Sequence, residues 1–102
     1  MARYELSTTA DARLDEIYLS TRERWGDEQA TSYVQGLFDC FDDIASKRFP
    51  WRAVAPEFGI EGYYRRCEHH FIYWREWADG TVGIVTVLHE RMHQLDRFRD
   101  DL

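Results

Sequence analysis

The spacing of the apolar residues changes halfway along the 102-residue chain, and this change constrains the fold more than any other feature. Before residue 50, apolar side chains recur at intervals of three and four, as in helices with one buried face. After residue 62 they form short runs, and Ala78-Asp79-Gly80 separates the last two. Because Asp-Gly between apolar runs indicates a β-hairpin, the chain combines a helical first half with a β second half.

Two helices are predicted in the first half. The first follows an N-cap at Thr8 or Thr9, and Gly26 followed by Asp27 indicates a stop and a new cap. A short turn at this point makes the pair an αα-hairpin. One apolar stripe of the second helix lies opposite three aspartates. The stripe is Ala30, Tyr33, Val34, Leu37, Phe38, Phe41, Ile44 and Ala45, and the aspartates are Asp39, Asp42 and Asp43.

The segment Pro50–Gly62 is the only predicted linker, since it holds both prolines and two of the six glycines. Strands are predicted over residues 4–7, 63–67, 70–77 and 81–89, followed by a polar tail from Met92 that is either a short helix or irregular. The order is β-α-α-β-β-β. It predicts a single α+β domain over residues 1–102, with the helical hairpin packed on a small antiparallel sheet.

Both faces of the predicted sheet are apolar. Since the helices cover one face, the other requires a cover, either from the linker and tail or from another protein. Strict alternation places Phe71, Tyr73 and Trp77 opposite Ile72 and Trp74 in one strand, and Val82, Ile84 and Leu88 opposite Val85 and Val87 in the next.

The charge balance argues against direct binding to nucleic acid. The chain has 13 Lys+Arg against 19 Asp+Glu, a formal net charge of −6, and Lys47 is its only lysine.

The chain has no apolar run of about 18 residues and no signal-peptide pattern at its start, so we expect a cytosolic protein that does not enter a membrane. Cys40 and Cys67 are too few for a disulfide framework, and we expect both to be reduced packing residues.

The string His89-Glu90-Arg91-Met92-His93 matches the H-E-x-x-H motif of zinc metallopeptidases. That motif needs both histidines on one helix, whereas His89 closes a strand pattern and no third ligand is evident. Cys67, His69 and His70 do not complete a simple site either. We therefore predict no metal or cofactor, and a zinc peptidase is only a remote alternative. We expect His70 and His89 to form hydrogen bonds on or near the sheet instead.

Four arginines concentrate on the predicted sheet and its exit. Arginines that converge can bind a phosphate or carboxylate, but adjacent strand residues point to opposite faces. We expect ion pairs with acidic neighbours instead. The arginines are Arg65, Arg66, Arg75 and Arg91, and the expected partners are Glu57, Glu61, Glu68 and Glu76.

Several segments together resemble one family over nearly the whole chain. They are Leu6-Ser7, the Ala12/Leu14/Ile17 helix, Arg24-Trp25-Gly26-Asp27-Glu28-Gln29-Ala30 with Tyr33, Gly62-Tyr63 with Arg65-Arg66-Cys67, His70-Phe71-Ile72-Tyr73-Trp74-Arg75, and Val87-Leu88-His89-Glu90-Arg91-Met92. The sequence resembles the ParE toxins of the ParE/RelE superfamily, the toxin halves of bacterial type II toxin–antitoxin modules. His93 departs from the family pattern, which has Asp there.

The resemblance implies a toxin that binds and inhibits DNA gyrase and is neutralised by a ParD-like antitoxin in a hetero-oligomer. Antitoxin-binding candidates are Leu14, Tyr18, Trp25, Tyr33, Trp74 and Trp77, and target-binding candidates are His89, Arg91, Met92 and Phe98.

The alternative within the superfamily is a RelE-like, ribosome-dependent mRNA endonuclease. Such an enzyme uses cationic residues on the sheet and a C-terminal Tyr. Here Arg91, His70 and Arg66 are the catalytic candidates, but no Tyr follows Arg91 and the expected strand Arg is His70. We therefore favour a toxin without enzymatic activity.

Overall fold

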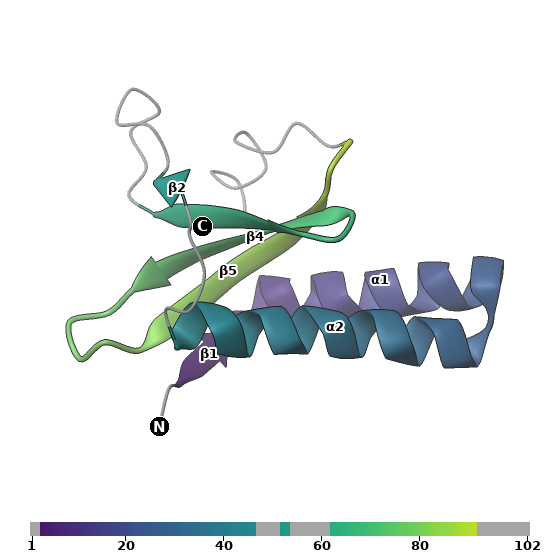
Figure 1. Ribbon diagram of the computed structural model, residues 1–102, viewed down its shortest axis with the longest axis horizontal. Helices are drawn as coiled ribbons and strands as arrows, with labels where there is room; N and C mark the ends of the chain where they lie inside the picture. Colours follow the sequence, from purple (N-terminus) through teal and green to yellow (C-terminus); the bar gives the residue numbers. More distant parts are fainter. Residues whose placement is uncertain (1–2, 47–51, 54–61, 92–102) are drawn as a thin grey trace.

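A computed structural model describes residues 3–46, 52–53 and 62–91. Two helices lie side by side on one face of a sheet (Figure 1), which confirms the predicted α+β fold. One short strand, β2, was not predicted. The elements are β1 (Tyr4–Leu6), α1 (Thr8–Trp25), α2 (Asp27–Ala45), β2 (Arg52–Ala53), β3 (Tyr63–Cys67), β4 (His70–Glu76) and β5 (Val82–His89). No helix among these residues is long and apolar enough to cross a membrane.

Both helix starts differ by one residue from the prediction. Ser7 caps α1, since its Oγ accepts the Ala10 N–H at 2.9 Å, so the cap is neither Thr8 nor Thr9. Gly26, with φ 92°, ends α1 and also precedes α2: its N–H donates to the Arg22 carbonyl at 2.9 Å and its carbonyl accepts the Ala30 N–H at 3.1 Å. One glycine therefore serves both helix ends.

The sheet has the order β1-β5-β4-β3-β2 and is mixed, not wholly antiparallel. β1 pairs in parallel with β5, with Tyr4 opposite Val82, whereas the other neighbours are antiparallel. A parallel pair needs a long crossover connection. The helical hairpin lies between β1 and the later strands in the sequence, so it belongs to that crossover.

A β-bulge changes the predicted faces of β5. Tyr73 pairs with Thr86 and Trp74 with Ile84, so Val85 has no paired residue across from it. Val87 consequently joins Val82 and Ile84 in the core beneath the helices, while Leu88 lies opposite Phe71 on the far face. The prediction that Leu88 shares a face with Val82 and Ile84 was wrong because alternation holds only without a bulge.

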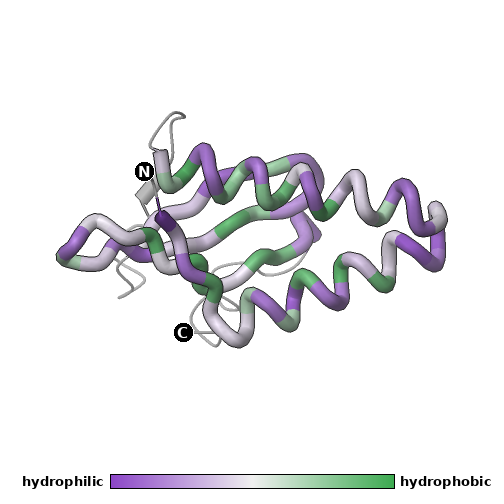
Figure 2. Tube along the Cα trace, turned by 90° about the horizontal axis from the view of Figure 1, so that it is seen from below, coloured by the Kyte–Doolittle hydropathy of each residue, from purple (hydrophilic) through white to green (hydrophobic). Residues whose placement is uncertain are grey.

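The core lies between the helical hairpin and the sheet. Hydrophobic and hydrophilic residues alternate along both helices in Figure 2, as the helical spacing predicts. Leu14, Leu37 and Phe41 from the helices pack against Ile72 and other apolar residues of the sheet. On the far face Tyr73, Thr86 and Leu88 are also buried. Of the two covers expected for this face, the linker and tail or another protein, the tail and most of the linker lie outside the described residues.

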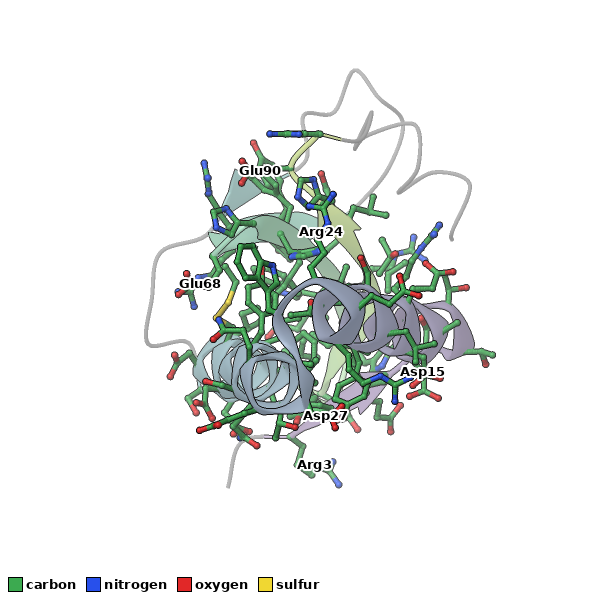
Figure 3. The ribbon with its side chains drawn as sticks, turned by 90° about the vertical axis from the view of Figure 1, so that its right-hand side faces the viewer. Arg3, Asp15, Arg24, Asp27, Glu68 and Glu90 are labelled. Atoms are coloured by element: carbon green, nitrogen blue, oxygen red, sulfur yellow. A yellow bond between two sulfur atoms is a disulfide. The ribbon has the colours of Figure 1, made fainter. Side chains whose placement is uncertain are left out.

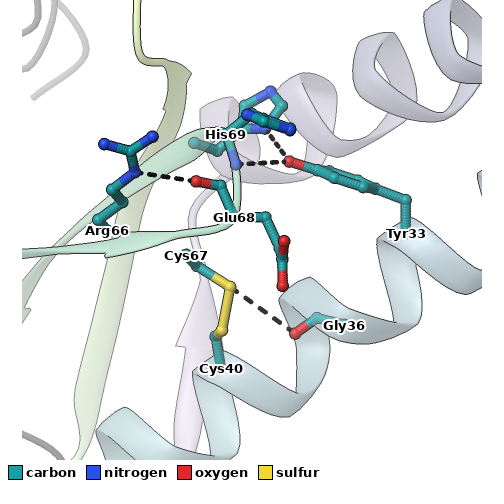
Figure 4. The surroundings of a disulfide bond; sticks show 8 residues. Tyr33, Gly36, Cys40, Arg66, Cys67, Glu68 and His69 are labelled. Carbon is teal, nitrogen blue, oxygen red and sulfur yellow. Dashed lines mark hydrogen bonds between the residues drawn. A yellow bond between two sulfur atoms is a disulfide. The ribbon is translucent and has the colours of Figure 1, made fainter.

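Cys40 and Cys67 form a disulfide that joins α2 to β3, with Cα atoms 6.6 Å apart (Figure 4). The prediction of two reduced cysteines was therefore wrong. The two residues are 27 positions apart in the sequence, and only the packing of α2 beside β3 makes them neighbours.

Candidate functional site

The helical hairpin extends past the β3–β4 turn (Figure 1). Side chains of the hairpin and of this end of the sheet line a groove. The groove has a volume of about 1090 Å³. Its walls come from α1, the start of α2, the β3–β4 turn and the end of β5. Among the lining residues are Ile17, Arg24, Trp25, Tyr33, His69, His70, Val87, His89, Glu90 and Arg91.

Tyr33 connects α2 to the β3–β4 turn. Its hydroxyl accepts the backbone N–H of His69 at 3.1 Å and lies 2.7 Å from Nδ1 of His70 (Figure 4 draws the contact with His69). Burial raises the pKa of Tyr33, so the hydroxyl keeps its proton. When Nδ1 is the unprotonated nitrogen of the neutral ring, the hydroxyl donates to it. His70 then carries its own proton on Nε2.

His70 is held in its neutral form. The pKa of His70 is lowered to about 4, chiefly by burial and in smaller part by the neighbouring His89 and His69. The rings of His70 and His89 meet edge to face with centroids 5.2 Å apart, and Nδ1 of His89 accepts the Arg91 N–H at 3.2 Å. Hydrogen bonds of His70 and His89 near the sheet were predicted, and both are present.

Glu90 joins the end of β5 to the β3–β4 turn. Its carboxylate lies 2.8 Å from the Arg66 guanidinium and 3.4 Å from Nδ1 of His69, and its N–H donates to the His69 carbonyl at 3.0 Å. Arg66 also donates from Nε to the Glu68 carbonyl at 3.0 Å. The ion-pair partner of Arg66 is thus Glu90, which was not among the four predicted glutamates.

The six predicted antitoxin-binding residues occupy different environments. Leu14 and Trp74 lie in the core, with exposed fractions of 5% and 3%, so they do not form an accessible surface. Trp25, 71% exposed, and Tyr33 line the groove. The other two lie elsewhere: Tyr18 has its ring beneath the Arg22 guanidinium, and Trp77 lines a 210 Å³ pocket near β1.

Two of the four predicted target-binding residues lie at the groove. His89 and Arg91 line it beside Glu90. Met92 and Phe98 lie outside the described residues.

The described part of the groove does not have the geometry of a metal site. Within residues 3–46, 52–53 and 62–91, no three His, Cys, Asp or Glu side chains are placed to hold a metal ion. The zinc alternative requires His89 and His93 on one face of a helix. His89 is instead the last residue of β5, so this requirement is not met. His93 lies outside the described residues.

Sequence reasoning missed Arg24 and Glu90. In Figure 3, which views the helices from the hairpin end, both lie on the side facing the sheet, whereas Asp15 and Asp27 lie away from it. The spacing of Ile17, Thr21 and Arg24 at i, i+4 and i+7 was a signal for this face of α1. Glu90 gave no comparable signal, because its ion pair with Arg66 joins distant parts of the sequence.

The fold and the groove define a small α+β domain with an open surface groove, and comparison with known proteins identifies its family. Residues 4–94 match the model of the ParE toxin family of the type II toxin–antitoxin system parDE. The chain is 37% identical to Toxin ParE1 of Mycobacterium tuberculosis over 93 residues, covering 89% of this chain and 92% of that protein. It is 31% identical to Toxin ParE of Escherichia coli over 102 residues, covering 100% of this chain and 98% of that protein.

The chain therefore belongs to the ParE toxin family, as the sequence resemblance predicted. A solved structure, the chromosomal ParDE toxin–antitoxin system from P. aeruginosa, has the same fold, with a TM-score of 0.71 at 18% identity. The match covers 87% of this chain and 96% of that one.

Proposed function

We propose that this ParE family member is the toxin of a type II module, that it inhibits DNA gyrase by binding, and that a ParD-like antitoxin neutralises it by occupying the groove. The groove is the observation that carries the proposal. It combines two apolar side chains that reach the surface, Ile17 and Trp25, with two exposed cations, Arg24 and Arg91. An amphipathic segment with acidic residues fits such a surface.

The charges of the site favour a protein partner over RNA. Arg66 is engaged by Glu90, and His70 stays neutral, so two of the three nuclease candidates do not supply free positive charge. The net charge of −6 opposes the approach of ribosomal RNA. A protein target does not require a cationic surface.

A supercoiling assay with purified gyrase tests the proposed target. We expect the purified chain to inhibit supercoiling, and the antitoxin encoded beside it to abolish this inhibition. Unchanged gyrase activity, together with cleavage of mRNA on translating ribosomes, would show that the chain is a nuclease instead.

Arg91 is the residue to test at the target-binding edge. It is exposed beside His89, so Arg91→Ala should leave folding intact and weaken gyrase inhibition about tenfold. Arg3→Ala is the matched control, because Arg3 is another exposed arginine, paired with Asp79 and absent from the groove lining. Full toxicity of the Arg91 variant on induction would refute this assignment.

A further inference from the structure

The β3–β4 turn, which forms one rim of the groove, is held against α2 by two adjacent links. One is the Tyr33 hydroxyl, bonded to His69 and His70; the other is the Cys40–Cys67 disulfide. Tyr33 and Cys40 are seven residues apart in α2, so they lie on the same helix face. Figure 4 shows both links side by side.

The disulfide joins β3 at its last residue, directly before the turn. Cys67 ends β3, and Glu68 follows with φ 56°, a left-handed conformation that is uncommon for a residue other than glycine. Such a conformation persists only where its surroundings enforce it. The disulfide lies at the residue next to Glu68, and Arg66 donates a hydrogen bond to the Glu68 carbonyl at 3.0 Å.

The residues of the β3–β4 turn that follow Cys67 line the groove. Glu68, His69 and His70 all line the groove, opposite Trp25 and Arg24 of α1. A change in the position of the turn therefore changes the groove. A rim fixed before binding spares the complex the cost of ordering it.

We propose that the Cys40–Cys67 disulfide is a redox switch for the groove: the oxidised chain holds the rim ready for the antitoxin, and reduction loosens it. This proposal rests on the proposed function, whose partner binds at the groove. The sequence contains two cysteines, so the switch has two states and no alternative internal pairing.

A dithiol can reduce the bond in two exchange steps. Its thiolate attacks Sγ of Cys40, which is partly exposed, whereas Cys67 is only 5% exposed. The S–S bond breaks, Cys67 leaves as a thiolate and takes up a proton, and the second thiol of the reductant displaces Cys40. The protein gains two electrons and two protons, and the dithiol becomes a disulfide.

The first test needs no partner. Amide hydrogen exchange at His69 is measured by NMR in the oxidised chain and after reduction with dithiothreitol. We expect exchange to become about tenfold faster on reduction, because the N–H bonded to Tyr33 is released more often. Protection should return when oxidised glutathione restores the bond. Exchange that changes less than about twofold would overturn the proposal.

The second test measures affinity for the antitoxin encoded beside this chain, by calorimetry, with far-UV circular dichroism to confirm folding. We expect binding about tenfold weaker after reduction, and weak binding by Cys40→Ser/Cys67→Ser with or without dithiothreitol. Equal, tight binding by both forms of the natural chain would overturn the switch while leaving the proposed function intact. Binding by neither form would overturn the proposed function, and the exchange result would still report whether the disulfide holds the turn.

Discussion

At the scale of single residues, the Tyr33 hydroxyl makes two contacts that no other side chain in α2 duplicates. Tyr33→Phe keeps the ring but leaves His70 Nδ1 without this hydrogen-bond partner and the His69 N–H without this acceptor. We expect a loss of about 1–2 kcal/mol in the free energy of unfolding, measured by urea denaturation. Tyr18→Phe is the control, with a change below about 0.5 kcal/mol, since Tyr18 is partly exposed and its ring lies beneath Arg22. Equal effects would contradict the role of the hydroxyl.

His70 makes the stability of the fold depend on pH. Its pKa is lowered to about 4 in the folded chain, with His89 and His69 opposing its protonation and Glu90 favouring it. Between that value and an unfolded pKa of about 6.5, the unfolded chain binds more protons, so stability falls as pH falls through this window. We expect a loss of about 2 kcal/mol, less than the full shift implies because part of the ring reaches solvent.

Urea denaturation at several pH values between 7.5 and 4 measures this loss. His70→Asn should reduce the slope of stability against pH, whereas His69→Gln should preserve it, because the side chain of His69 is exposed. If instead His69→Gln alone flattened the profile, His70 would not be the group responsible.

At the scale of secondary-structure elements, Gly26 allows two long helices to join with a single connecting residue. Its φ of 92° is unfavourable for other residues, whereas a Cβ there would meet nothing within 4 Å. We expect Gly26→Ala to cost about 1 kcal/mol through backbone conformation alone. Gly36→Ala is a matched comparison, because it also has open space but lies inside α2. It should stabilise the chain by about 0.5–1 kcal/mol, and thermal unfolding would measure both changes. A loss of stability in both variants would contradict this explanation.

The same elements show which structural features the sequence could predict. The bounds of α1, α2, β3, β4 and β5 were predicted to within one or two residues. Each of these segments has apolar residues at a spacing typical of a helix or of a strand. The bulge at Val85 and the disulfide were not predicted. Both depend on which strand or helix lies alongside, and a periodic pattern contains no such information.

The candidate site was predicted only in part for a related reason. Trp25, Tyr33 and Arg91 were selected individually, and they line one groove. Leu14 and Trp74 were selected by the same resemblance but belong to the core. An aromatic or apolar residue at a helical or strand position has the same pattern whether it is buried or exposed. Only the three-dimensional arrangement separates the two.

At the scale of the whole molecule, the chain is acidic, and its groove lies between the helical hairpin and one end of the sheet. Two glutamates of the groove are already paired, Glu16 with Arg13 at 3.5 Å and Glu90 with Arg66 at 2.8 Å. These ion pairs offset negative charge in the groove, whereas the net charge of −6 is spread over the rest of the chain as well. An acidic partner therefore meets less repulsion at the groove than a uniformly acidic surface would present.

Trp25 and Leu19 provide the sharpest test that the partner uses this groove. Both are exposed apolar residues of α1, at 71% and 49%, so neither truncation should unfold the chain, but only Trp25 lines the groove. We expect Trp25→Ala to weaken antitoxin binding by about 2 kcal/mol, roughly thirtyfold, because a large aromatic anchor is lost. Leu19→Ala should change affinity less than about threefold. Calorimetric titration of each variant with the antitoxin measures both, and a larger effect at Leu19 would place the antitoxin on the outer face of α1 instead.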